Sequence, residues 1–208
     1  MLVQSLIKTI KRSIMKQLKK IILFGASAFF MNASFAQMDT KMDNKMETTV
    51  EVGGAPMYPS KNIVENAVNS KDHTTLVAAV KAAGLVETLQ SKGPFTVFAP
   101  TNKAFEMLPA GTVDNLLKPE NKQVLTNVLT YHVIAGRFSA ADLMAKIKAG
   151  KGTAELQTVS GGKIWISMKG NTIAIKDENG GWSFVTIKDV NQSNGVIHVV
   201  DHVILPKM

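Results

Sequence analysis

Apolar residues recur at two different periods along the chain, and the period changes near residue 150. Before that point most segments repeat apolar residues every three or four positions, which is typical of helices with one buried face. After it, apolar and polar residues alternate in short runs between glycine- and asparagine-rich turns, which is typical of strands. Helices followed by strands predict an α+β domain. The expected helices span residues 62–68, 72–83, 85–89, 101–108, 119–129 and 139–149, and the expected strands span residues 95–99, 131–135, 154–159, 163–168, 172–176, 182–187 and 196–205.

The ends of several expected helices carry residues that usually cap them. Asp72 is the expected N-cap of a helix that Gly84 closes. Ser139 and Asp142 have the spacing of a capping box, and Pro119 suits the first turn of the helix that follows it. These local signals therefore agree with the helices that the apolar period predicts.

Residues 1–36 have the organisation of a secretory signal peptide. Six Lys and Arg residues and no acid lie within residues 1–20, an uncharged apolar run covers residues 21–31, and Ser34 and Ala36 form a small-x-small exit. A membrane anchor is the alternative, but eleven residues rise only about 16 Å as a helix, roughly half of a hydrocarbon core. We therefore expect cleavage after Ala36, translation from either Met1 or Met15, and a periplasmic or extracellular protein.

The basic character of the chain belongs mostly to this N-terminal segment. The formal net charge is +8, and removal of residues 1–36 takes away six cations and no acid, which leaves +2. A balance so close to neutral does not indicate nucleic-acid binding. The absence of cysteine excludes thiol nucleophiles, thiolate zinc sites and disulfides, so a hydrophobic core has to stabilise the secreted domain.

Residues 37–57 are expected to form a disordered, methionine-rich linker, because they hold few large apolar residues to offset the entropy of ordering. Met38, Met42 and Met46 recur every four positions, a spacing at which thioethers could also bind a soft metal. No His or Cys accompanies them. The linker interpretation is therefore favoured, and no metal site or cofactor is predicted.

His198 and His202 are the sharpest candidates for metal ligands, because histidines four residues apart on a helix can chelate zinc. The residues around them are mostly β-branched, which favours a strand. On a strand the two side chains would share a face about 13 Å apart, too far for one ion. We therefore expect a strand packed on both faces with structural histidines, and with Asp201 pointing away from both.

Two further polar segments leave structural and functional interpretations open. Thr101 or Asn102 is expected to cap the short helix that carries Phe105, a structural role. Tyr131 and His132 follow a helix directly, and are either a polar pair that ties the helix to the next strand or a recognition patch. No sequence signature joins a nucleophile, a base and an orienting group, so the chain is not predicted to be an enzyme.

Three segments together resemble the fasciclin domain family. Residues 96–105 read Thr-Val-Phe-Ala-Pro-Thr-Asn-Lys-Ala-Phe, close to the first signature of the family. Tyr131-His132 matches its central element, and residues 194–206, from Asn-Gly-Val-Ile-His to Pro, match its closing signature. The three matches occur in the family's order and spacing, and the resemblance covers residues 58–206.

The resemblance implies a fold in which a wedge of β-strands packs on a helical lobe. It implies a secreted, non-catalytic binding module for adhesion to a cell surface, extracellular matrix or biofilm, with a matrix protein or polysaccharide as partner. Contacts with partners are implied for Tyr131, His132 and Asp201. Integrin binding is not expected, since the chain has no Arg-Gly-Asp and no Asp-Ile pair. A structural role within the signatures is expected for Thr96, Phe98, Pro100, Thr101, Asn102, Phe105, Asn194, Gly195, His198, His202 and Pro206.

An alternative function follows from some fasciclin-like proteins that resemble carotenoid carriers. The helical half is rich in Leu, Val and Met, and Met107 and Met144 could adapt to an apolar ligand. The chain could then carry an apolar small molecule such as a carotenoid or a lipid, although an ordinary closed core explains the same residues.

Overall fold

The computed structural model of the protein describes residues 47–207. The predicted signal peptide, residues 1–36, and residues 37–46 of the predicted linker lie outside this part of the chain. The helices are α2 (Ile63–Ala67), η1 (Lys71–His73), α3 (Thr74–Ala83), α4 (Val86–Gln90), α5 (Asn102–Glu106), α6 (Thr112–Leu116), η2 (Pro119–Asn121), α7 (Lys122–Tyr131) and α8 (Ala140–Ala149). The strands are β1 (Val50–Val52), β2 (Ala55–Met57), β3 (Phe95–Pro100), β4 (Val133–Ala135), β5 (Thr153–Gln157), β6 (Lys163–Lys169), β7 (Thr172–Lys176), β8 (Trp182–Gln192) and β9 (Gly195–Val200).

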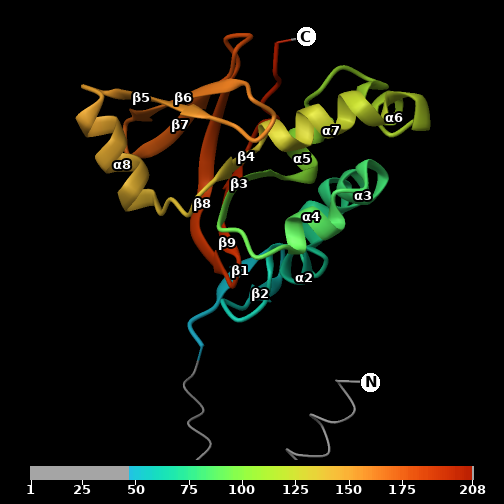
Figure 1. The fold of residues 1–208 in the computed structure, drawn as a ribbon, viewed down its shortest axis with the longest axis horizontal. Coiled ribbons are helices and arrows are strands. Elements are labelled where there is room, and N and C mark those ends of the chain that lie inside the picture. The colour runs from blue at the N-terminus through green and yellow to red at the C-terminus, as the bar shows by residue number, and fades with distance from the viewer. Residues whose placement is uncertain (1–46, 208) are drawn as a thin grey trace, which may run out of the picture. The chain divides into compact units, whose positions relative to one another are not determined.

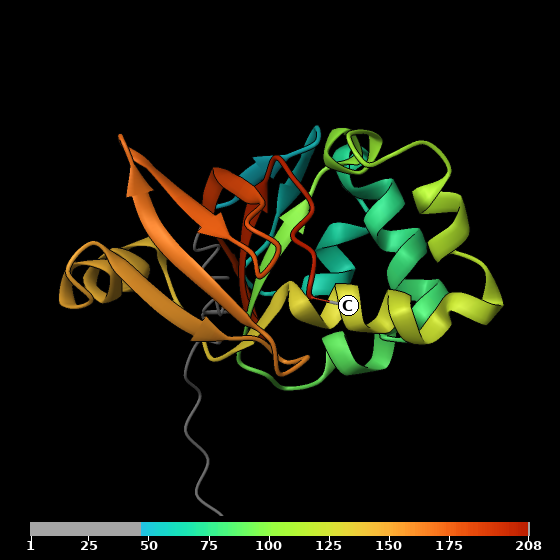
Figure 2. The same ribbon diagram turned by 90° about the horizontal axis from the view of Figure 1, so that it is seen from above.

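Within the described residues, one seven-stranded sheet has the order β4-β3-β9-β8-β7-β6-β5. Its two edges approach each other, because Val159, just after β5, donates its N–H to the carbonyl oxygen of Val133 in β4 at 2.8 Å. The sheet is thus bent into a nearly closed wedge, and helices α2 to α7 form a lobe beside it (Figures 1 and 2). The predicted α+β fold, with a β-wedge packed against a helical lobe, is confirmed.

The first and the last signature segments are neighbouring strands. β3 and β9 pair in parallel with the register Phe95↔Gly195 to Pro100↔Val200. All six residues of β9 are buried, as expected for a strand packed on both faces. The two segments that lie far apart in the sequence therefore form the centre of the sheet.

Two hydrophobic cores lie on opposite sides of these central strands. The first core lies between the helical lobe and the sheet, and it includes Val80, Leu125, Val97 and Ile197. The second core lies inside the bend of the sheet, where α8 packs against β5 and β6. Because side chains alternate along a strand, β3 and β9 supply both cores, as Val97 and Phe98 show.

The expected boundaries were wrong in several places. Residues 50–57, part of the predicted linker, form the hairpin β1–β2, whose turn residues Gly53 and Gly54 have φ values of +58° and +74°. Val52, Ala55 and Met57 are buried in the first core, and the Gly53 carbonyl accepts the N–H of Lys71 at 3.1 Å, so the hairpin is tied to the domain. Helix α6 had no predicted counterpart, and β8 continues five residues past its predicted end at Ile187.

Three predictions about individual residues were also wrong. Asp72 lies within η1, and α3 begins after His73 with no capping side chain of its own. β9 ends at Val200, so His202 does not share the strand of His198. Tyr131 is the last residue of α7 and not part of the following strand. In the part of the chain from 47 to 207, none of the helices has the length and apolar character needed to cross a bilayer.

Candidate functional site

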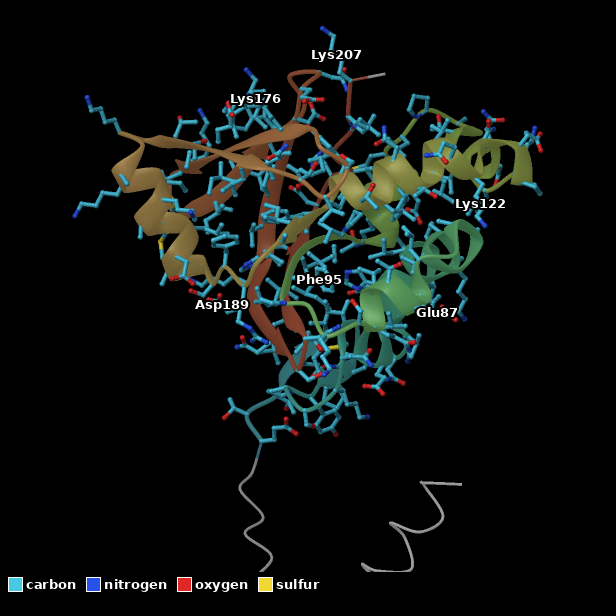
Figure 3. All side chains as sticks on the ribbon, in the orientation of Figure 1. Glu87, Phe95, Lys122, Lys176, Asp189 and Lys207 are labelled. Atoms are coloured by element: carbon cyan, nitrogen blue, oxygen red, sulfur yellow. The ribbon has the colours of Figure 1, made fainter. Side chains whose placement is uncertain are left out.

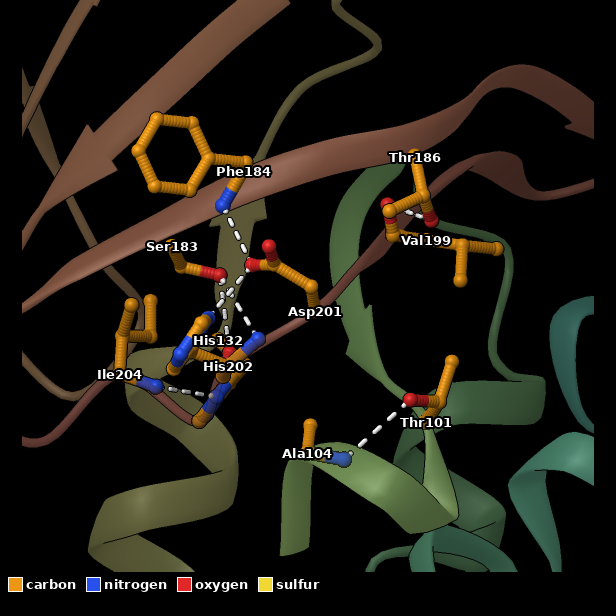
Figure 4. Close-up of polar contacts among 10 residues, drawn as sticks. All are labelled: Thr101, Ala104, His132, Ser183, Phe184, Thr186, Val199, Asp201, His202 and Ile204. Carbon is orange, nitrogen blue, oxygen red and sulfur yellow. Dashed lines mark hydrogen bonds and ion pairs between the residues drawn. The ribbon is translucent and has the colours of Figure 1, made fainter. Parts of the chain in front are cut away.

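His132 joins helix α7 to the C-terminal segment. Its Nδ1–H donates to the carbonyl oxygen of Val128 at 2.8 Å. Its Nε2 accepts the backbone N–H of Ile204 at 3.1 Å (Figure 4). These partners require the neutral tautomer with the proton on Nδ1. Burial lowers the pKa of this imidazole to about 4, although the Val128 carbonyl and Asp177 act in the opposite direction.

Tyr131 is also part of the interior. Its hydroxyl donates to the carbonyl oxygen of Lys163 at 2.6 Å and accepts the N–H of Glu178 at 3.2 Å. Burial raises the pKa of this phenol to about 12. The exposed fractions of Tyr131 and His132 are 0% and 3%. The expectation that both side chains contact a partner was wrong, since both are occupied in holding α7 to the rest of the fold.

His198, in β9, bonds to the segment that leads into α8. Its Nε2–H donates to the carbonyl oxygen of Phe138 at 2.9 Å, and its Nδ1 accepts the N–H of Asp189 at 3.3 Å. The ring stacks on Phe98 with a centroid separation of 5.8 Å. These two bonds require a neutral imidazole with its proton on Nε2, the nitrogen opposite to that of His132. Burial lowers the pKa of His198 and so favours this neutral form.

Asp201 and His202 are the polar pair of the closing signature that reaches the surface. Asp201 Oδ1 lies 2.8 Å from His202 Nδ1 and accepts the N–H of Phe184 at 2.7 Å (Figure 4). The side chains of His202 and Asp201 are 39% and 35% exposed. Asp201 therefore points toward His202 and not away from it, contrary to the expectation. The Ser183 hydroxyl donates to the backbone oxygen of His202 and accepts its N–H, so its polar contacts are with the backbone and not with the ring.

The first signature places polar side chains at the ends of three elements. Thr96 Oγ1 donates to the Gly136 carbonyl at 2.7 Å and accepts the N–H of Phe138 at 2.9 Å. Thr101 is the N-cap of α5, where its Oγ1 accepts the N–H of Ala104 at 3.3 Å (Figure 4). Asn102 instead reaches the start of α3, the end that Asp72 was expected to cap. The buried residues Phe98, Pro100 and Phe105 complete this segment.

Asn102 supplies the missing cap of α3. Its Oδ1 accepts the N–H of Thr75 at 3.0 Å, and its amide donates to the Lys71 carbonyl and to Thr74 Oγ1, each at 2.9 Å. One amide group thus satisfies donors and acceptors around the first turn of α3.

The closing signature begins with an equally connected amide. Asn194 Oδ1 accepts the N–H of Ile63 at 3.0 Å, and its Nδ2 donates to Leu89 and Ser91 carbonyl oxygens at 2.7 and 2.8 Å. At Gly195, an added Cβ would lie 2.3 Å from the carbonyl oxygen of Phe95, so no larger residue fits without moving β3. At the other end of the signature Pro206 is buried, and its carbonyl accepts from Asn179 at 3.1 Å.

An apolar cavity of about 90 Å³ lies in the first core between the helical lobe and the sheet. Leu76, Val80, Leu129 and Ile197 are among its lining residues. His73 also borders it, with Nδ1 bonded to Ser70 Oγ at 2.9 Å, and its Nε2 lacks a hydrogen bond of normal geometry within residues 47–207. Burial lowers the pKa of His73, and the Ala99 carbonyl opposes this shift.

Within residues 47–207 no three His, Asp or Glu side chains come together as a metal site. The polar residues of the signatures therefore form hydrogen-bonded connections between elements. Asp201 and His202 are among the surface groups that remain free to contact a partner. A second such group consists of the tryptophans and lysines on the outer face of β6 to β8, and no sequence motif identified it. The alternation of Trp165 with Ile164 and Ile166 was the available signal for that face.

Comparison with known proteins places this architecture in a family. Residues 71–206 match the Fasciclin domain family. The chain is 41% identical over 198 residues to "Protein sll1483" of Synechocystis sp., and this alignment covers 93% of this chain and 100% of that protein. It is 37% identical to "Immunogenic protein MPB70" of Mycobacterium bovis, over 67% of this chain and 66% of that protein.

A solved structure shares the fold. A FAS1 domain pair from the insect cell adhesion molecule Fasciclin I superposes with a TM-score of 0.62, covering 77% of this chain and 58% of that one, at 18% identity. The extent of the sequence match, the order of the signature segments and the wedge-and-lobe fold agree, and the chain belongs to the fasciclin domain family.

Proposed function

We propose that this chain is a secreted, non-catalytic binding module that mediates adhesion to a cell surface, extracellular matrix or biofilm. The observation that carries the proposal is membership of the fasciclin domain family, whose fold the insect cell adhesion molecule Fasciclin I also has. Fold alone does not determine function, so the proposal needs a test at the level of cells.

The decisive experiment compares a strain that lacks the gene with its parent and with a complemented strain. We expect the strain without the gene to attach less to a surface or to form a thinner biofilm, and complementation to restore attachment. Unchanged attachment, together with no binding of the purified protein to cells, matrix proteins or polysaccharides, would rule out the adhesion function.

Export is part of the same proposal and has its own test. We propose that residues 1–36 are removed after Ala36 and that the protein acts in the periplasm or outside the cell, because a basic segment, a short apolar run and a small-residue exit follow one another there. N-terminal sequencing of the protein from periplasm and culture fluid checks this. A first residue of Gln37 supports cleavage, whereas an intact N-terminus in the cytoplasm contradicts it.

The absence of catalysis is supported by how the histidines are used. Both ring nitrogens of His132 and of His198 are engaged by backbone groups, which leaves neither ring available as a general base. In His202 only Nδ1 is engaged, by Asp201, which is an orientation that a general base could have, but the Ser183 hydroxyl bonds to the backbone of His202 and not to its ring. A hydrolase screen with a His202→Ala control tests the point, since activity lost in that variant without loss of folding would establish an enzyme.

We propose Asp201 and His202 as the contact residues of the closing signature, because they are its exposed polar pair. Asp201→Asn keeps an oxygen that can accept the Phe184 N–H but removes the charge, and His202→Gln removes the imidazole. If this pair contacts the partner, the double variant restores less attachment than the parent gene while its thermal stability stays near that of the parent protein. Full restoration would exclude the pair.

An apolar carrier is the second candidate, and the cavity beside His73 is the observation in its favour. A cavity of about 150 Å³ lined by apolar side chains holds one benzene molecule, and the cavity here is smaller, at about 90 Å³. A carotenoid or a lipid chain would therefore require the helical lobe to separate from the sheet. Visible absorbance or co-purifying lipid in protein from its native host would support a carrier, whereas a colourless, lipid-free preparation would count against it.

A further inference from the structure

The outer face of strands β6, β7 and β8 has a regular row of large side chains. The strand register places Trp165 opposite Lys176, and Lys176 opposite Trp182. Their sequence neighbours Ile164, Ile166 and Ile175 belong to the second core. Because side chains alternate along a strand, this row lies on the sheet face directed away from that core, and Figure 3 shows Lys176 on the side opposite α8.

This face is aromatic and partly open to solvent. It carries Trp165 and Trp182, the two tryptophans of the chain, and Trp182 is 37% exposed. The next row of the register places Ser167 opposite Ala174, and Ala174 opposite Phe184. Small residues thus lie between larger aromatic ones. Among the described residues the hydroxyl of Ser167, which is 8% exposed, has no hydrogen-bond partner. A buried hydroxyl without a partner is uncommon, and this one lies beneath the surface of the face, out of reach of a ligand.

Two ammonium groups converge on the Trp182 ring. Lys169 Nζ lies 4.8 Å and Lys176 Nζ lies 6.0 Å from the ring centroid. Within residues 47–207 neither lysine forms an ion pair. Of the nearby carboxylates, Glu155 lies opposite Trp165 in the register and pairs with Lys163 at 2.9 Å, while Asp201 accepts from Phe184 and lies against His202. Like charges that are held near each other without a counter-ion favour the binding of an anion between them.

The outer face of β6–β8, defined by Trp165, Ser167, Lys169, Lys176, Trp182 and Phe184, combines an aromatic platform with two unpaired cations. We propose that it binds an acidic polysaccharide, an inference that rests on the proposed adhesion function and names the chemistry of its partner. The apolar C–H face of a sugar ring stacks on Trp182, and a carboxylate of the chain lies between Lys169 and Lys176.

Several features favour this partner over other anions. An extended glycan is long enough to span a row of residues that crosses three strands about 4.8 Å apart, whereas a single small anion would use only the two lysines. A membrane surface is attracted by clusters of several basic residues, and this face has two unpaired cations. The contacts between lysine and tryptophan are each worth little when exposed, so a sugar can displace one lysine from the ring at small cost.

Titration of the protein with polygalacturonate tests the inference, with methyl-esterified polygalacturonate as the neutral comparator of the same backbone. Because both tryptophans lie on the face, intrinsic fluorescence reports binding directly. We expect a fluorescence change that saturates with the charged polymer, is weaker with the esterified polymer and diminishes as salt is added.

Variants then assign the binding to this face. Lys169→Gln with Lys176→Gln is expected to weaken binding about tenfold or more, because charge-assisted contacts are lost. Trp182→Ala is expected to weaken it to a similar degree, and isothermal titration replaces fluorescence for this variant. The matched control is Lys103→Gln with Lys122→Gln on the helical lobe, which changes the net charge equally and should leave the affinity unchanged. Thermal unfolding confirms that every variant is folded.

The results separate this inference from the adhesion function. Three results would overturn the inference, even if the gene is needed for attachment. They are no binding of polygalacturonate, equal weakening of binding by the control pair, and tighter binding to phosphatidylglycerol vesicles that the same lysine variants abolish. Conversely, polygalacturonate binding that depends on Trp182 and the two lysines, in a strain whose attachment does not need the gene, supports the inference and contradicts the adhesion function.

Discussion

The backbone N–H of Ile204 donates to Nε2 of His132 at 3.1 Å, so one buried imidazole fastens the end of the chain to helix α7. The opposite ring nitrogen donates to Val128 in the last turn of that helix. The ring therefore substitutes for a strand partner beyond the point where β9 ends. This bond explains why the Tyr131-His132 element and the closing signature occur together, since the first holds the backbone of the second.

Replacement of His132 by Phe should destabilise the protein by about 2–3 kcal/mol, because it removes both bonds and leaves the Ile204 N–H buried without a partner. The aromatic ring retains most of the volume, so the loss reports hydrogen bonding more than packing. Urea unfolding measures the change. His202→Ala is the matched control, with an expected effect within about 0.5–1 kcal/mol since that ring is half exposed. Equal effects of the two substitutions would contradict the role given to His132.

Acid should destabilise the fold through the same imidazole. The pKa of His132 is lowered from 6.5 to about 4, so the unfolded chain binds a proton more readily than the folded one between these values. The stability contributed by the neutral ring is complete above about pH 6.5 and falls as the pH approaches 4, by about 3 kcal/mol in total. The lowered pKa values of His73 and His198 act in the same direction. Urea midpoints between pH 7 and pH 4 measure this loss.

The contribution of His132 to the pH effect can be separated by a variant. In His132→Gln no group titrates at this position, so the loss of stability between pH 7 and pH 4 should be smaller than in the parent protein. The carboxylates contribute equally to both proteins and cancel in the comparison. Identical pH dependence in the two proteins would show that another group is responsible.

Asn194→Ala should cost about 2–4 kcal/mol, because a single amide serves the Ile63 N–H and the carbonyl oxygens of Leu89 and Ser91. These groups belong to different segments of the helical lobe, so the substitution loosens the lobe against the central strands. Asn69→Ala provides the comparison, since Asn69 is exposed and bonds only to Glu65 in its own segment. Thermal unfolding of the two variants should differ by several degrees. Similar transition temperatures would disprove the connecting role of Asn194.

The apolar period was sufficient to predict most elements, since burial of one face determines them. The apolar period failed to predict segments whose backbone N–H groups bond to side chains instead of to a neighbouring strand or helix turn. Residues 203–205 are apolar and read as a continuation of β9, yet the N–H groups of Ile204 and Leu205 bond to His132 Nε2 and to Asp177 Oδ2. A sequence window contains neither of these distant acceptors, so it cannot distinguish such a segment from a strand.

The candidate site was less predictable than the fold, for a related reason. Tyr131 and His132 are polar and follow a helix, and nothing local shows that the start of β6 and the C-terminal segment cover them. The row formed by Trp165, Lys176 and Trp182 depends on the register of three strands, which a single strand's sequence does not define. Residues that act within one element were predictable, as the capping box of Ser139 and Asp142 shows.

The cap of α3 offers the last test, because it comes from another part of the chain. Asn102→Ala removes the acceptor of the Thr75 N–H and the donors to Lys71 and Thr74, with an expected cost of about 1–2 kcal/mol. Asp72→Ala should cost less than about 0.5 kcal/mol, since Asp72 does not cap the helix. Native-state hydrogen exchange locates the effect, and the first turn of α3 should lose protection in Asn102→Ala alone. Loss of protection in Asp72→Ala, or in neither variant, would mean that Asn102 does not stabilise this helix end.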